Sequence, residues 1–299
     1  MFRKCAFILF IFTISGYAAG AGETGLSFLE VGVDARGVGM GEAHTAAANG
    51  AAALFWNPAG QLGADPSNAL FNHNEWLEGI RGESAALSLR SGRAAWGFQV
   101  RSFNIGEIEV RDIPSSLPLE ETSAHYLSAG LSYARRFGDR LDVGITGKYL
   151  FEKIYVESAS GLALDVGAIY QLPAWHLKIG AALTNAGSMG KLKNDETVLP
   201  TTIRAGLYYQ LPLNSPDYTA ALAADAVKPF KKDGGVHIGG EFTFLNHIAL
   251  RGGWLIGYEN RSFSGGLGVF RSSIRFDYAL IPFDKDFGVT HRLTLSFNL

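Results

Sequence analysis

Ten charged or imidazole side chains in the second half of the chain share a face with small polar residues. Carboxylates beside arginines form bidentate ion pairs, and imidazoles transfer protons or bind metals. All ten have the parity of an inward face, so we expect them to line one enclosed lumen, as a polar track or as partners of an internal segment. Because an enclosed lumen must satisfy its polar groups internally, plain arginine–carboxylate pairing is the simpler interpretation. The ten residues are His176, Lys178, Arg204, Asp225, His237, Glu241, Arg251, Arg275, Asp277 and Arg292.

The remaining chemistry-bearing residues do not assemble into a catalytic or metal-binding pattern. A hydrolase needs a serine, a histidine and an acid held together, but the seven histidines are scattered and no Gly-x-Ser-x-Gly turn occurs. No two histidines have the i, i+2 or i, i+4 spacing typical of metal ligands. The run Gly37-x-Gly39-x-Gly41 lacks the Gly-x-Gly-x-x-Gly spacing of a dinucleotide loop. We therefore predict a protein that is not an enzyme and uses no cofactor or metal.

Composition narrows the class of protein further. Lys and Arg total 26 against 28 Asp and Glu, which leaves no positive excess for a nucleic-acid partner. The chain is 47% hydrophobic, with a mean hydropathy of +0.09. Past residue 20, however, no apolar run reaches the roughly 18 residues of a transmembrane helix. High hydrophobicity without a spanning helix favours membrane β-structure.

The first 21 residues have the pattern of a signal peptide. Arg3 and Lys4 precede the apolar run Cys5–Ile14, and Ala19–Ala21 fits a small-x-small cleavage site. We predict export, with a mature chain that starts near Gly22. Removal of Cys5 would leave that mature chain without cysteine.

Residues 67–299 alternate between apolar and polar side chains with a period of two, as the strands of a transmembrane β-barrel do. In the last segment, 287–299, the odd positions are mostly apolar and the even positions are polar or glycine. The connections between the strands alternate between mostly short and longer ones. A soluble β-sandwich is not expected to show this alternation. We predict an all-β, antiparallel barrel of about fourteen strands in a Gram-negative-type outer membrane, with twelve or sixteen strands as alternatives. The predicted strands are 67–73, 83–91, 93–103, 122–137, 140–153, 158–171, 174–185, 200–212, 217–227, 235–245, 247–257, 261–270, 272–282 and 287–299.

Residues 22–66 do not alternate. The stretch Glu42–Trp56 is rich in alanine and glycine and is helix-permissive, with an expected break at Asn49–Gly50 and an expected end at Pro58. A lumen of about fourteen strands is too wide to be filled by wall side chains alone. We therefore predict that residues 22–66 form a helical hatch inside the barrel.

The hatch residues carry a family resemblance. The run Phe28–Ala43, continued by Ala46–Gly60, resembles the N-terminal signature of the PorV/PorQ family. That family is related to FadL-type fatty-acid transporters, whose hatch carries the same Asn-Pro-Ala triplet. This chain departs from the pattern in its modest loops and in Gly50, where the family commonly has Asp. The hatch motif comprises Gly39, Gly41, Asn49, Trp56, Asn57, Pro58 and Ala59.

The resemblance implies two different functions. PorV/PorQ-like proteins are accessory outer-membrane components of type IX secretion, which would make secretion proteins or exported cargo the partners. FadL-like proteins pass small hydrophobic molecules through the barrel wall when the hatch moves. Outer-membrane lipid would surround the barrel in both cases. The short chain favours the accessory component, and the transporter remains the alternative.

Overall fold

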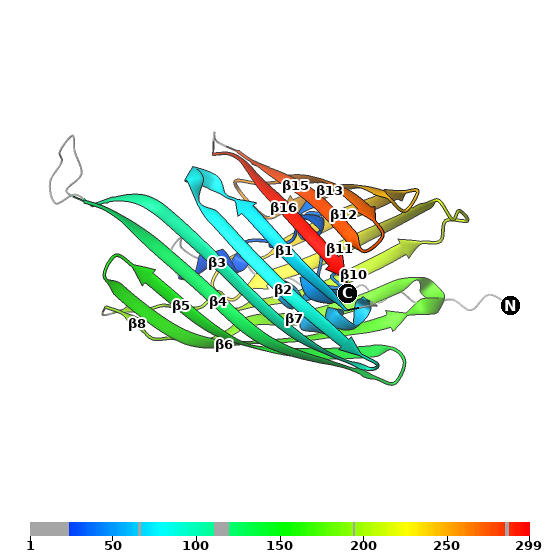
Figure 1. The fold of residues 1–299 in the computed structure, drawn as a ribbon, viewed down its shortest axis with the longest axis horizontal. Helices are drawn as coiled ribbons and strands as arrows, with labels where there is room; N and C mark the ends of the chain where they lie inside the picture. Colours follow the sequence, from blue (N-terminus) through cyan, green and yellow to red (C-terminus); the bar gives the residue numbers. More distant parts are fainter. Residues whose placement is uncertain (1–23, 65–66, 111–119, 194, 285–286) are drawn as a thin grey trace.

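The computed structural model describes residues 24–64, 67–110, 120–193, 195–284 and 287–299. Fourteen antiparallel strands close into one barrel (Figure 1), which confirms the predicted fold and strand number. The ring closes where β1 pairs with β16, with Asn68 opposite Asn298. The barrel strands are β1 (Asn68–Glu75), β2 (Arg81–Ser91), β3 (Ala94–Val110), β4 (Glu120–Phe137), β5 (Leu141–Ile154), β6 (Glu157–Leu172), β7 (Leu177–Met189), β10 (Thr202–Leu211), β11 (Tyr218–Pro229), β12 (Gly235–Phe244), β13 (Ile248–Ile256), β14 (Phe263–Arg271), β15 (Ile274–Phe283) and β16 (Gly288–Asn298).

The alternation of residue types corresponds to the two faces of this wall. On β13, Leu250 and Trp254 are exposed on the outer face, whereas Ala249, Arg251 and Leu255 are buried inside. Successive side chains of a strand point to opposite faces, so an apolar outer band and a polar inner surface follow directly from the sequence. Among the described residues, no helix is long and apolar enough to cross a bilayer.

The connections follow the predicted asymmetry only in part. Tyr155 and Val156 alone join β5 to β6, although a longer loop was expected on that side. β3 and β4 instead extend to Val110 and from Glu120, so the predicted loop 104–121 shrinks to 111–119, which lies outside the described residues. After β7, a small hairpin of β8 (Lys191–Leu192) and β9 (Asp195–Glu196) occupies the loop.

One predicted lumen residue lies elsewhere. Strand β7 begins at Leu177 rather than at 174, because η5 (Pro173–Trp175) forms a 3-10 turn and His176 follows it with a positive φ of 52°. His176 is therefore exposed in the connection between β6 and β7, and its prediction as a lumen residue was wrong.

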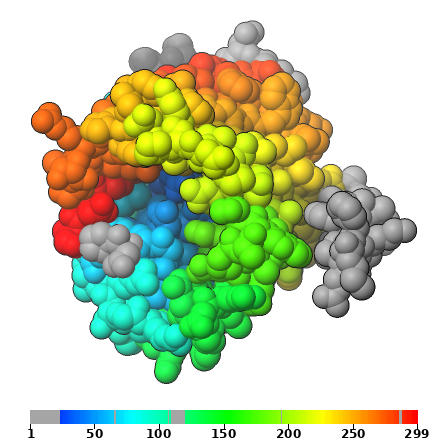
Figure 2. All heavy atoms as spheres, turned by 90° about the vertical axis from the view of Figure 1, so that its right-hand side faces the viewer, coloured from blue at the N-terminus to red at the C-terminus, as the bar shows by residue number. Residues whose placement is uncertain are grey.

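Residues 24–64 lie inside the barrel, where short helices contact strands on opposite walls. The elements are η1 (Ser27–Glu30), α1 (Ala35–Gly39), η2 (Gly50–Phe55) and η3 (Pro58–Gly63); η4 (Leu77–Gly79) lies in the connection between β1 and β2. α1 contacts β13 to β16, whereas η3 contacts β2 to β6. Figure 2 looks into the barrel from the right-hand end of Figure 1, and the hatch is visible within the hollow at this end. The predicted signal peptide falls outside the described residues.

The helices of the hatch differ from the prediction in detail. Pro58 does not end a helix but occupies the first position of η3, where its fixed φ and missing N–H cost nothing. The helix-permissive stretch from Glu42 forms turns before Asn49, and the 3-10 helix η2 begins at Gly50, so the predicted break at Asn49–Gly50 is confirmed. A run of small side chains permits a helix, but the contacts with the barrel wall set the observed path.

Candidate functional site

Close contacts between the hatch and the barrel wall depend on glycine at two positions. Gly41 has a φ of +66°, a conformation that residues with a Cβ rarely adopt. A Cβ at Gly41 would also lie 2.8 Å from the Ile238 carbonyl oxygen and from the Trp254 amide nitrogen. Gly39 approaches the wall in the same way, since a Cβ there would lie 3.0 Å from the Gly266 Cα. The two glycines of the hatch motif therefore allow backbone to pack directly on backbone.

The Asn-Pro-Ala triplet fixes the opposite part of the hatch. The Asn57 side chain accepts a hydrogen bond from the Ala59 amide at 3.2 Å. Its amide group donates to the carbonyls of Thr45 at 2.9 Å and of Ala168, in β6, at 3.2 Å. Asn57 and Ala59 are fully buried, whereas Asn49 of the same motif is exposed and caps η2 without a side-chain hydrogen bond. The triplet thus ties η3 to the rest of the hatch and to the wall.

A buried group inside the hatch holds its helices together. The carboxylate of Asp34 accepts hydrogen bonds from the Gly37 amide at 2.9 Å and from the Trp56 indole at 2.6 Å. His44 packs edge-on against Trp56 and lies 3.7 Å from Asp34. Burial lowers the pKa of His44 to about 4, which keeps its imidazole neutral at neutral pH.

The wall formed by β12 to β15 binds the hatch through a network of charges. Arg36 of α1 forms a bidentate pair with Glu241, at 2.9 and 2.8 Å. Arg251 bridges Glu241 at 2.7 Å and Asp277 at 2.9 Å. Arg275 binds Asp277 at 2.7 Å. One hatch arginine and four wall residues therefore form a single network.

A second group of ion pairs holds the segment after α1. Asp225 accepts hydrogen bonds from the backbone amides of His44 and Thr45, each at 2.9 Å. Arg204 donates to the Glu42 carbonyl at 2.7 Å and lies 3.5 Å from Asp225. The Glu42 carboxylate pairs with Arg261 at 2.8 Å. Burial raises the pKa of Glu42, but the charges of Arg261 and other nearby groups, together with the hydrogen bond from Arg261, lower it to about 2.

Three further predicted lumen residues point inward without a carboxylate partner within 4.0 Å among the described residues. His237 hydrogen-bonds the Tyr258 hydroxyl at 2.7 Å. The Lys178 ammonium lies 5.6 Å from the centre of the Tyr208 ring, and the Arg292 guanidinium lies 4.8 Å from that of Trp76. Nine of the ten predicted residues are therefore in the lumen. Their assignment as a functional site stays a prediction.

Sequence reasoning missed several charged residues of the lumen. Arg261 lies between β13 and β14, where no alternation indicates a direction. Arg36 and Glu42 lie in the hatch, which has no strand parity. Arg101 and Lys148 could have been found, because Arg101 follows Gln99 on the inward parity of β3 and Lys148 has the inward parity of β5. Lys148 pairs with Asp165 at 2.6 Å.

A cavity of about 850 Å³ lies between the hatch and the inner wall. Its lining includes the aromatic residues Phe28, Phe103 and Tyr126 and the arginines Arg101, Arg204 and Arg261. Lys232, from the loop between β11 and β12, also lines it and pairs with Glu30 of η1. The cavity therefore combines an apolar surface with cationic groups and with the carboxylates of Glu30, Glu42, Asp233 and Glu259.

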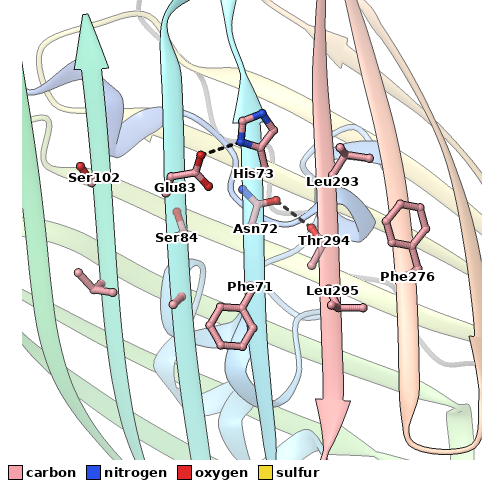
Figure 3. Close-up of a pocket in the computed structure, with 12 residues that line it drawn as sticks. Phe71, Asn72, His73, Glu83, Ser84, Ser102, Phe276, Leu293, Thr294 and Leu295 are labelled. Carbon is pink, nitrogen blue, oxygen red and sulfur yellow. Dashed lines mark hydrogen bonds and ion pairs between the residues drawn. The ribbon is translucent and has the colours of Figure 1, made fainter.

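A smaller hollow of about 400 Å³ lies on the outer face (Figure 3). His73 of β1 and Glu83 of β2 form a 2.7 Å pair there, with side chains 40% and 61% exposed. Phe71, Phe276 and Leu295 also line the hollow. Because the two polar side chains satisfy each other and are exposed, this hollow has no feature that requires a ligand.

Comparisons with known proteins agree with this architecture. A family model described as "Type IX secretion system protein PorV" matches residues 19–225. Among solved structures, the monoaromatic hydrocarbon channel CymD superposes with a TM-score of 0.65 at 13% identity, over 90% of this chain and 98% of that chain. The Pseudomonas putida toluene transporter TodX gives the same TM-score and identity, over 90% and 99%. The search of curated proteins gave no match.

Proposed function

Because the chain belongs to the PorV family of type IX secretion proteins, we propose that it is a non-enzymatic accessory barrel that holds or guides secretion partners at its rim. The family match carries this proposal, since it covers the hatch and most of the barrel up to residue 225. Outer-membrane lipid surrounds the barrel. Binding of a secretion partner is part of what we propose.

The fixed hatch supports the role of a closed platform. Moving α1 out of the lumen would separate Arg36 from Glu241, and moving the next segment would separate Glu42 from Arg261. Breaking a buried pair leaves an uncompensated charge, at a cost of about 3–5 kcal/mol. A barrel closed in this way is suited to binding partners on its outside.

The most prominent rim surface lies at the ends of β3 to β6. These strands extend beyond their neighbours to the left in Figure 1, where the turn Tyr155–Val156 joins β5 to β6. Val156 is 70% exposed, and Tyr155 donates a hydrogen bond to Glu120 at 3.0 Å. Tyr155 and Val156 are neighbours and both exposed, so they give this tip a small apolar surface that can contact a protein partner.

The proposal is tested by purifying the tagged full-length chain from outer membranes in mild detergent, with mass spectrometry of the bound proteins. We expect large type IX secretion components or exported proteins to co-purify. Val156→Asp should reduce their recovery several-fold, whereas Leu213→Asp, at an exposed apolar site in the turn between β10 and β11, should not. A barrel that consistently purifies without any protein partner contradicts the proposal.

A second function, transport of small hydrophobic molecules, is favoured by the fold of the two hydrocarbon channels and by the lumen cavity. It requires a lateral opening for release into the membrane. Among the described residues, strand pairing continues around the whole ring, with register shifts only at Ile105/Ile108 and Leu164/Val166. The accessory role therefore remains the better-supported proposal. Co-purification of a specific apolar molecule with a lone barrel would reverse this order.

A further inference from the structure

Positive charge at one end of the barrel is concentrated in a single sector. At the end where β1 begins and β16 ends, all six connections between strands have two to six residues. Short turns face the periplasm in bacterial outer-membrane barrels, so we call this the periplasmic end. Five arginines lie in or beside the β2–β3 and β4–β5 turns, namely Arg90, Arg93, Arg135, Arg136 and Arg140. The other connections at this end contain no lysine or arginine, and a single arginine, Arg271, directly adjoins one of them; they are residues 173–176, 212–217, 245–247 and 272–273.

The acids of the two arginine-rich turns are already engaged by other arginines. Asp139 pairs with Arg93 at 2.8 Å. Asp142 is buried inside the barrel, where Arg136 donates two hydrogen bonds to it at 2.6 and 2.8 Å. Arg135, by contrast, has no carboxylate within 4.0 Å among the described residues. Its positive charge is therefore not balanced by a close acid in this part of the chain.

Arg135 lies on the lipid-facing side of β4, where its neighbours are apolar or aromatic. It is exposed, and the residues before and after it on the same face of the strand are Tyr133 and Phe137. Its partners on the adjacent strands are Ala94 of β3 and Val143 of β5. An ionised side chain on the lipid-facing wall is unfavourable unless it reaches an anion or the polar interface.

The side chain of Arg135 is directed toward the membrane interface. Its guanidinium carbon lies 5.9 Å from the ring centre of Phe137, the residue nearer the periplasmic end. Long cationic side chains at a membrane surface extend in this way to place their charge at the headgroups. On the other side of Arg135, Trp96 is 62% exposed and its ring centre lies 4.7 Å from that of Tyr133. Exposed Trp and Tyr side chains are typical of the membrane interface.

We propose that Arg135 binds the phosphodiester of an anionic phospholipid in the inner leaflet, with the glycerol and the first chain carbons against Trp96 and Tyr133. A guanidinium suits this ligand because it donates two parallel hydrogen bonds to phosphate oxygens. Arg140, exposed in the turn after β4, adds positive charge and favours a headgroup with a net negative charge. This inference goes beyond the proposed function and does not depend on it, because the proposed partner surface lies at the opposite ends of the same strands (Figure 1).

The test is native mass spectrometry of the purified full-length barrel in non-ionic detergent, titrated with dioleoylphosphatidylglycerol and, as the zwitterionic match, dioleoylphosphatidylcholine. We expect the phosphatidylglycerol to bind about five-fold more tightly, the effect of roughly one cation near a membrane surface. Arg135→Gln should remove most of this preference, and Arg135→Lys should fall between because an ammonium lacks the parallel donors. Arg271→Gln removes another exposed arginine at the periplasmic end, on β14, and should leave the preference unchanged. Thermal unfolding of each variant checks that the barrel is folded.

Equal affinity for the two lipids, or an unchanged preference in Arg135→Gln, would overturn the proposal. An equal loss in Arg271→Gln would also overturn it, because any positive charge at this end would then suffice. Glycerol 3-phosphate carries the phosphate without the chains, so competition by it at the concentration of the lipid would show a free-anion site and contradict a lipid site. Displacement of the lipid by polyglutamate at a lower concentration would instead assign these turns to an acidic protein partner. None of these results bears on the co-purification experiment.

Discussion

Two groups of buried arginines in the same lumen differ in how their charge is balanced. On the wall of β12 to β15, Arg251 and Arg275 share the acids Glu241 and Asp277 with Arg36 of the hatch. By contrast, Arg101 of β3 and Arg292 of β16 hydrogen-bond only backbone carbonyls among the described residues, those of Val31 and Gly32 in the hatch and of His291 in β16. The first group is paired with acids and holds an internal segment, whereas no carboxylate lies within 4.0 Å of the second group among the described residues. The comparison shows that knowing which strand residues point into the lumen does not tell which of them form ion pairs that hold the hatch.

The largest effect is expected from removing the shared acid of the anchoring wall. Glu241→Gln leaves Arg36, Arg251 and Arg275 with Asp277 as the one remaining acid of the network. We expect a loss of about 3–5 kcal/mol in the free energy of unfolding, measured by chemical denaturation in detergent micelles. Asp139→Asn, at the exposed pair with Arg93, should change it by at most about 1 kcal/mol. Equal effects would mean that the buried network does not anchor the hatch.

Low pH should lower the stability of the protein because of the buried His44 in the hatch. Its pKa is about 4 in the folded protein and 6.5 when unfolded, so the unfolded state binds more protons between these values. Stability is therefore complete above pH 6.5 and falls as the pH drops to 4, by up to about 3 kcal/mol for this group. Asp34, Arg36, Glu241 and Arg251 act on the imidazole. His44→Gln should flatten unfolding curves measured across this pH range, and an unchanged slope would contradict the assignment.

Backbone contact with the anchoring wall should be sensitive to a single methyl group. Gly41→Ala adds a Cβ at a positive φ against Ile238 and Trp254, and we expect a loss of about 1–3 kcal/mol in the free energy of unfolding. Gly147→Ala is the matched control, because a Cβ there would meet no atom within 4 Å. The thermal unfolding temperature of both variants measures the difference. Similar temperatures would show that the hatch can move away from the wall.

The smallest change in stability is expected from a substitution of Arg101, and this variant tests most directly whether the two groups of arginines differ. Arg101→Met removes an unbalanced buried charge while keeping an apolar side chain beside Phe28 and Phe103. We expect the free energy of unfolding to change by less than about 1 kcal/mol, whereas Arg251→Met should lower it by about 3–5 kcal/mol. A large loss of stability in Arg101→Met would show that both groups of arginines serve mainly to hold the hatch.

The strands could be predicted from the sequence because alternation is a local property. Thirteen of the fourteen predicted segments begin within two residues of an observed strand. The exception is 174–185, whose strand begins three residues later, at Leu177, because Pro173–Trp175 form a turn. His176 was misplaced for the same reason, because the alternation of side chains between two faces gives no direction for residues outside a strand. The turns of the hatch were also beyond local reasoning, because a run of alanine and glycine permits several backbone paths.

The sequence by itself determined the barrel, its strand number and the inward direction of nine of the ten polar residues. Only the tertiary structure decided which charges meet. Arg36 and Glu241 are 205 residues apart, and His44 and Asp225 are 181 apart. Whether an inward arginine finds an acid depends on the registers of neighbouring strands and on the path of the hatch. For Arg101, that three-dimensional arrangement leaves the buried Nε without an acceptor among the described residues, a property that no local pattern encodes.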